Sequence, residues 1–104
     1  MDLLGPIDTR YGKALVHLLE YQHGKRMAVQ LMDAYDYGLI ATLSVNLPDE
    51  SIEKGEFFVK GWNENEQIIE DCRKSGLFTD TGKRVKTGFV MAEVWRMKNA
   101  KETS

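Results

Sequence analysis

Hydrophobic and polar residues alternate most regularly over residues 39–47 (LIATLSVNL). Side chains two residues apart share a face of a strand. One face therefore holds Leu39, Ala41, Leu43, Val45 and Leu47, and the other holds Ile40, Thr42, Ser44 and Asn46. This pattern predicts a half-buried antiparallel strand with a wetter outer face. Pro48 lacks the N–H that a ladder needs, so the strand is expected to end there.

Four further apolar segments predict strands: residues 14–22 (ALVHLLEYQ), 27–32 (MAVQLM), 57–62 (FFVKGW) and 88–97 (GFVMAEVWRM). The segments between them are rich in glycine and aspartate, which favour turns. Turns are therefore expected at residues 23–25, 33–38 and 80–82.

Residues 61–76 (GWNENEQIIEDCRKSG) carry the signals of one helix. Asn63 or Asn65 is expected to cap its start, and carboxylates in the first turn suit the helix dipole. Arg73 lies in the expected last turn, and Gly76 is placed to end the helix.

Together these elements predict an α+β domain. Its expected core is a mostly antiparallel, curved five-stranded sheet, in the order β-β-β-β-α-β, with one helix packed on it. Residues 1–104 are expected to form a single domain, with flexible tails at residues 1–10 and 99–104. One helix is too small to cover Met27, Met32, Met91, Met97, Trp62 and Trp95. Either the sheet curls into a partial barrel, or a partner covers its apolar face.

Composition narrows the class of protein. A net charge of −2 gives no reason to expect non-specific binding to nucleic acid or to a membrane surface. The single cysteine cannot form an internal disulfide, which favours a reducing compartment. The chain shows no signal peptide and no apolar run of about 18 residues. We therefore expect a cytoplasmic bacterial or viral protein without membrane association.

The residues capable of chemistry do not form a recognisable catalytic or metal site. Cys72 falls on the apolar face of the expected helix, so it is interpreted as core. His17 and His23 have no ligands at zinc spacing. Glu66 and Glu70 share a helix face, but capping and surface roles explain them better than metal binding. No enzyme activity, cofactor or metal is expected.

Charge is unevenly distributed along the chain. Residues 49–71 contain eight acids and two lysines, a net −6, while the remainder carries +4. An acidic surface is suited to a partner with a basic surface, and an aromatic anchor adds affinity. The expected partner-binding residues are Asp49, Glu50, Glu53, Glu56, Trp62, Glu64, Glu66 and Glu70.

The basic segment 81–88 (TGKRVKTG) supports an alternative. It is expected to form a glycine-bounded loop, and exposed loops often carry function. Lys83, Arg84 and Lys86 would then bind nucleic acid, which is the less favoured hypothesis because the chain lacks a broad basic face.

Three segments resemble a family of short bacterial proteins known as domain of unknown function 4313: QLMDAYDYGLIATLSVNLPDE, ENE and GLFTDTGKRVKTGFV. The resemblance covers residues 27–95 and implies an accessory protein of a phage, plasmid or other mobile element. It supplies no activity or site residue, and this chain departs from the pattern at DAYDYG and at VWR.

The predicted function is a non-enzymatic protein-binding accessory protein whose partner is a host protein with a basic surface. In its most specific form, this hypothesis predicts that the protein inhibits a host defence protein. A homodimer formed through an exposed edge strand is a further expectation.

Overall fold

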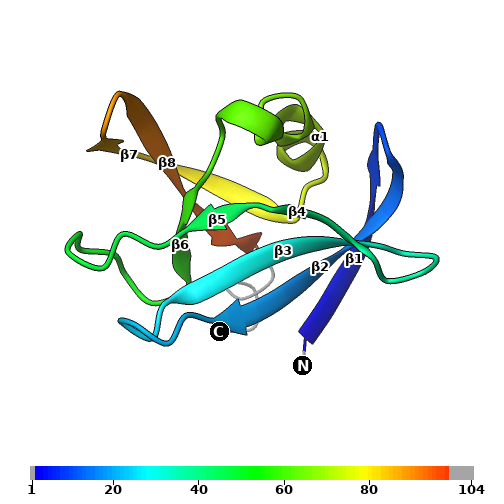
Figure 1. The fold of residues 1–104 in the computed structure, drawn as a ribbon, viewed down its shortest axis with the longest axis horizontal. Coiled ribbons are helices and arrows are strands. Elements are labelled where there is room, and N and C mark those ends of the chain that lie inside the picture. The colour runs from blue at the N-terminus through cyan, green and yellow to red at the C-terminus, as the bar shows by residue number, and fades with distance from the viewer. Residues whose placement is uncertain (1, 99–104) are drawn as a thin grey trace.

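The computed structural model describes residues 2–98, which form two antiparallel four-stranded sheets and one α-helix (Figure 1). The first sheet has the strand order β1-β2-β3-β4, and the second has the order β5-β6-β8-β7. Along the chain the elements are β1 (Asp2–Thr9), β2 (Gly12–Glu20), β3 (Met27–Asp33), β4 (Leu39–Thr42), β5 (Ser44–Val45), β6 (Glu56–Val59), the 3₁₀ turn η1 (Asn63–Asn65), α1 (Ile68–Lys74), β7 (Phe78–Thr87) and β8 (Val90–Met97).

The predicted α+β class, with antiparallel strands and one helix, is confirmed for the described residues, but the single five-stranded sheet is wrong. Part of the difference lies at the N-terminus, where the sequence predicts a flexible tail over residues 1–10. Instead β1 pairs with β2 and buries Ile7 in the core. The Gly5-Pro6 step lies where the pairing shifts between Leu4 and Ile7, and an edge strand tolerates such an interruption. The other predicted tail, 99–104, lies outside the described residues.

The strand predicted over residues 39–47 is divided at Leu43, where the chain passes from the first sheet to the second. The Leu43 N–H donates to the Val29 carbonyl at 2.8 Å, and the Leu43 carbonyl accepts from the Lys60 N–H at 2.7 Å. Because protein covers both sides of the chain at this corner, the predicted wet outer face is wrong at Ser44. That residue is buried, and its hydroxyl accepts a hydrogen bond from the Val29 N–H at 2.9 Å.

Two buried clusters hold the fold together. The larger lies between the sheets and includes Trp95, Phe57 and Phe78, whose rings meet at centroid distances of 5.4–6.3 Å. The smaller lies on the other face of the second sheet, where Val45, Leu47, Ile52 and Trp62 pack on Phe58, Ala92 and Val94. Most of the methionines and tryptophans therefore find apolar partners within the chain, Met27, Met97, Trp62 and Trp95 among them.

Helix α1 lies between the β1–β2 hairpin and the β7–β8 hairpin, at the top of Figure 1. Its apolar face buries Ile68, Ile69 and Cys72 in the larger cluster. Asp71 and Arg73 tie it to either side: the Arg10 N–H and Nε donate to Asp71 at 2.9 and 3.1 Å, and Arg73 donates to Glu93 of β8 at 3.1 Å. The helix thus bridges the two edge strands, β1 and β7, that do not pair with each other.

The predicted start of this helix is wrong and its predicted end is right. The first turn is the separate 3₁₀ turn η1, and neither η1 nor α1 has a side-chain cap. Asn65 is buried, and its amide donates to the carbonyls of Thr42 and Lys60, both at 2.8 Å. Its side chain therefore anchors η1 to β4 and to the end of β6. Gly76 follows the helix with φ +83°, a conformation that favours glycine.

The basic segment is a strand rather than a loop. β7 continues from Phe78 to Thr87, and the predicted turn at residues 80–82 is a bulge within it, with the pairing to β8 shifted between Asp80 and Arg84. The Asp80 carboxylate accepts the Gly82 N–H at 2.9 Å, so the turn chemistry is satisfied without ending the strand. The chain reverses after Thr87, where Gly88 and Phe89 connect β7 to β8.

Candidate functional site

The eight predicted partner-binding residues do not form one surface. Asp49, Glu50 and Glu53 are exposed in the segment between β5 and β6. Glu64, Glu66 and Glu70 are exposed on η1, α1 and the residues between them. The remaining two are less accessible: Glu56 is buried on β6, and Trp62 is partly buried against the smaller apolar cluster. Trp62 therefore contributes first to the stability of the second sheet.

Glu56 binds one of the residues assigned to the opposite hypothesis. Lys83 Nζ lies 2.9 Å from Glu56 Oε1, and the Glu53 N–H donates to the same oxygen at 3.1 Å. Burial by itself raises the pKa of Glu56, but the hydrogen bonds from Lys83 and the backbone outweigh it, so the pKa lies below its ordinary value. This pair fixes β6 to β7, which is a structural role for both residues.

Arg84 and Glu70 belong to a charged network that joins α1 to the second sheet. Arg84 donates to both oxygens of Asp80 at 3.0 Å, and Arg73 donates to Glu70 at 3.2 Å and to Glu93 at 3.1 Å. The Arg73 guanidinium also lies 5.3 Å from the centre of the Trp95 ring. The network leaves Arg84 and Glu70 less available to a partner than the sequence predicts.

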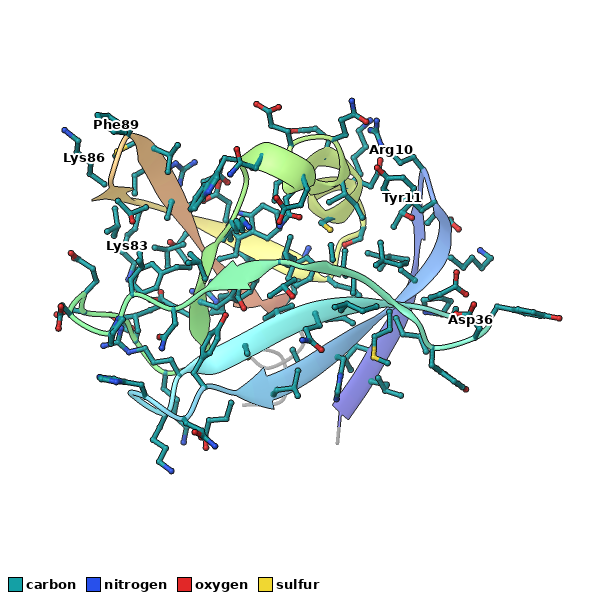
Figure 2. The ribbon with its side chains drawn as sticks, in the orientation of Figure 1. Arg10, Tyr11, Asp36, Lys83, Lys86 and Phe89 are labelled. Atoms are coloured by element: carbon teal, nitrogen blue, oxygen red, sulfur yellow. The ribbon has the colours of Figure 1, made fainter. Side chains whose placement is uncertain are left out.

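Lys86 is the predicted basic residue nearest the β7–β8 hairpin tip. It lines a pocket of about 170 Å³ together with Asp49 and Glu50, so predicted acids and bases meet here as well. The adjoining Phe89 is fully exposed, and Met91, one of the apolar residues that a single helix was expected to leave uncovered, is 55% exposed. Figure 2 shows Lys83, Lys86 and Phe89 together on the left of the molecule.

A second pocket, of about 200 Å³, lies between the start of α1 and the first sheet. We call it the η1 pocket; its lining residues are Tyr11, Ile40, Ala41, Glu64, Asn65 and Ile68. Lys60 Nζ donates to Glu64 Oε2 at 2.7 Å, and this hydrogen bond is the main reason that the pKa of Glu64 lies below its ordinary value. The Asn65 Oδ1 atom is buried and has no hydrogen-bond partner in the described part of the chain. The pocket thus combines apolar walls with the exposed carboxylate of Glu64.

Three exposed tyrosines lie at the end of the molecule formed by the β1–β2 and β3–β4 turns. Tyr11 is 56% exposed, Tyr35 is 95% exposed and Tyr37 is 59% exposed. The Ala34 N–H donates to the Lys13 carbonyl at 2.9 Å, which joins the two turns. Figure 2 shows Arg10, Tyr11 and Asp36 together at the right of the molecule. We call Tyr11, Tyr35 and Tyr37 the tyrosine end.

The turn that carries two of these tyrosines is held by side-chain hydrogen bonds. Asp33 Oδ1 accepts the N–H groups of Tyr35 and Asp36 at 2.7 and 3.2 Å, and Asp36 accepts the Gly38 N–H at 2.8 Å. The sequence analysis missed the tyrosines, although DAYDYG was available as a signal. Aspartates at these spacings fix the turn, and the fixed turn holds Tyr35 and Tyr37 outside the core.

The described residues contain no group of three His, Cys, Asp or Glu side chains arranged to hold a metal ion. Cys72 is fully buried, as the sequence predicts, and burial raises its pKa to about 12. Across residues 2–98, the structure has no helix with the length and hydrophobicity to span a membrane.

No protein-family model, curated protein or solved structure matches the chain. The resemblance to the domain family named above therefore stays a prediction.

Proposed function

We propose that this protein is a non-enzymatic protein-binding module whose binding surface is the tyrosine end together with the η1 pocket and the nearby acids. The observation that carries the proposal is that Tyr11 belongs to both features, so one exposed tyrosine of the tyrosine end also lines the pocket that holds Glu64. Tyrosine is enriched among the residues that dominate protein–protein binding, because it offers a large contact area and a hydroxyl.

The turns also suit this role energetically. Ordering a loop on binding costs free energy, and a turn that is already fixed avoids part of that cost. The hydrogen bonds of Asp33 and Asp36 fix the turn that presents Tyr35 and Tyr37.

The partner that fits is a protein with a basic surface. Glu64 is 65% exposed despite its contact with Lys60, and no ion pair within residues 2–98 involves the exposed Glu66. A lysine or arginine side chain from the partner would place its stem against Ile40 and Ile68, and its charge near Glu64. Given the resemblance to mobile-element proteins, the partner is a host protein, and a defence protein with a nucleic-acid groove is the sharpest version.

The test is affinity capture of the tagged protein from nuclease-treated host lysate. The variant Glu64→Lys/Glu66→Lys is compared with a matched control, Glu50→Lys/Glu53→Lys, which changes the net charge equally in the other acidic segment. One stoichiometric protein should be captured by the wild type and by the control, and lost from the Glu64/Glu66 variant. Unchanged capture by that variant, or equal loss from both variants, would contradict the proposed surface.

A second candidate function is binding of single-stranded nucleic acid at the β7–β8 hairpin tip. One observation favours it: the fully exposed Phe89 lies near Lys86, an arrangement that offers one stacking ring and one phosphate contact. Lys83 and Arg84 are held by Glu56 and Asp80 and add less than predicted. Fluorescence anisotropy with a labelled oligonucleotide tests this function. If this function is right, the affinity for the oligonucleotide should fall as the salt concentration rises, and binding should be lost in Phe89→Ala and in Lys86→Ala.

A further inference from the structure

Both faces of the first sheet are apolar. One face points into the larger cluster, with Val16, Val29 and Leu31 fully buried. On the other face, strand pairing places Leu15 opposite Met32, Met32 opposite Leu39, and Leu3 opposite His17. We call this the outer face and define it by Leu3, Leu15, Leu19, Met32 and Leu39. An antiparallel sheet with one face in water normally alternates apolar and polar residues, so an apolar outer face calls for a cover.

The outer face of the second sheet is also apolar, but other residues of the same chain cover it. Its outer residues Phe58, Ala92 and Val94 are covered by the segment that follows β5 and by Trp62. No side chain of the outer face of the first sheet belongs to either buried cluster of the described residues. His17 and Ala28 at the centre of this face are buried, whereas Leu3, Leu19 and Leu39 around them are exposed by 42%, 40% and 60%.

We propose that a second copy of this chain covers the outer face, so that two molecules pack sheet against sheet about a two-fold axis. The charge of the face selects this occupant. The residues that complete its centre, His17, Ala28, Gln30 and Thr42, include no acid, lysine or arginine. The charged residues of the same face, Asp8 and Lys13, lie at its β1–β2 hairpin end and pair with each other at 2.7 Å. A face of this kind offers nothing to a basic or acidic partner, whereas homodimer interfaces are the most apolar and charge-depleted class.

The size of the face is adequate for a dimer. The four strands hold 8, 9, 7 and 4 residues, and at about 3.3 Å by about 4.8 Å for each residue they cover roughly 440 Å² in plan before side-chain relief is counted. A stable interface needs about 800 Å² of accessible surface from each partner, and the plan area of the outer face is of the same order of magnitude.

This arrangement differs from the edge-strand pairing that the sequence predicts. It can be tested apart from the proposed function, because the outer face and α1 lie on opposite sides of the first sheet, and because Leu19 lies at the other end of β2 from Tyr11. If both hold, the dimer presents two copies of the η1 pocket, and a partner with two basic sites would bind with enhanced avidity.

Sedimentation velocity over a wide concentration range tests the proposal with the purified full chain. The wild type should sediment with twice the 11.9 kDa mass of one chain. Leu19→Glu should raise the dimer dissociation constant by roughly a hundredfold, because the two-fold axis places two carboxylates in the interface and each costs about tenfold. Leu39→Glu should act in the same direction. Both side chains are exposed, so the monomer should keep its fold, which circular dichroism checks.

Met91→Glu is the matched control, because it adds the same charge at an exposed apolar strand residue of the second sheet. Its mass should equal that of the wild type. A wild type that stays at the mass of one chain at its highest attainable concentration would overturn the proposal. Dissociation by Met91→Glu, with no effect of Leu19→Glu or Leu39→Glu, would overturn it as well, because the interface would then lie elsewhere.

Discussion

Lys83 and Glu56 form an ion pair of 2.9 Å between β7 and β6, with only 5% of the Glu56 side chain exposed. The pair joins one residue from the acidic stretch 49–71 to one from the basic segment 83–86. Lys86 likewise shares a pocket with Asp49 and Glu50. The charge separation seen along the chain is therefore partly cancelled in space, which leaves Glu64 and Glu66 as the acids best placed for a partner.

Removing Lys83 should destabilise the fold. Lys83→Ala leaves a buried carboxylate without its charged partner, which costs about 3–5 kcal/mol in a fully buried pair. Half of the Lys83 side chain is exposed, so we expect about 1–2 kcal/mol here. Urea denaturation measures this, with Lys86→Ala as the control, since no ion pair within residues 2–98 involves Lys86.

The same pair predicts the direction of a pH effect. The pKa of Glu56 is lower in the fold than its ordinary value of 4.5, so its stabilising contribution is present above pH 4.5. That contribution is lost as the pH falls through the lowered pKa. Glu56→Gln should therefore flatten the acid limb of the stability curve relative to the wild type. Thermal melts from pH 7 down to about pH 3 test this; parallel curves would contradict it.

Substituting Asn65 should lower the free energy of unfolding more than substituting most other polar residues. Its amide donates two buried hydrogen bonds, to the Thr42 and Lys60 carbonyls. Asn65→Ala leaves both carbonyls unsatisfied, and we expect a loss of about 2–3 kcal/mol in the free energy of unfolding. Gln67→Ala is the control, because the Gln67 side chain makes no capping bond at the start of α1. Equal effects of the two variants would mean that Asn65 does not anchor η1.

Cys72 should react only when the structure opens. It is fully buried, and burial, followed by the neighbouring Asp71 charge, raises its pKa to about 12. Thiolate is the reactive form, so labelling by a thiol reagent at pH 8 should be slow in native protein and fast in urea. Rapid labelling of the native protein would show that α1 separates from the sheets.

Local patterns predicted the strands better than they predicted how the strands assemble. The apolar runs 14–22 and 27–32 became β2 and β3. The corner at Leu43 was not predictable from period-two alternation, because the alternation continues unchanged while the chain passes between sheets. The Asp80–Gly82 turn signal was real, but it was absorbed as a bulge because β8 offers a partner on both sides of it. Charge pairing between strands that are distant in sequence, as between Glu56 of β6 and Lys83 of β7, depends on that assembly and cannot be read from the local sequence.

The candidate site was predicted in part for the same reason. Glu64 and Glu66 are exposed near the η1 pocket, as expected for acids at a helix start. The tyrosines were missed because an aromatic residue in a turn carries no periodic signal. Their exposure follows only from the hydrogen bonds that fix the turn.

The final prediction separates the two candidate functions by exchanging two exposed aromatic side chains for alanine. Tyr35 is 95% exposed and Phe89 is fully exposed, so neither substitution should change the free energy of unfolding by more than about 0.5 kcal/mol. If the tyrosine end binds a protein partner, Tyr35→Ala should weaken that complex at least tenfold in isothermal titration calorimetry, since central aromatic residues typically carry more than about 1.4 kcal/mol. Phe89→Ala should then leave it unchanged. The reverse outcome, together with oligonucleotide binding lost in Phe89→Ala, would place function at the β7–β8 hairpin tip, because a stacking ring acts only where the bases lie.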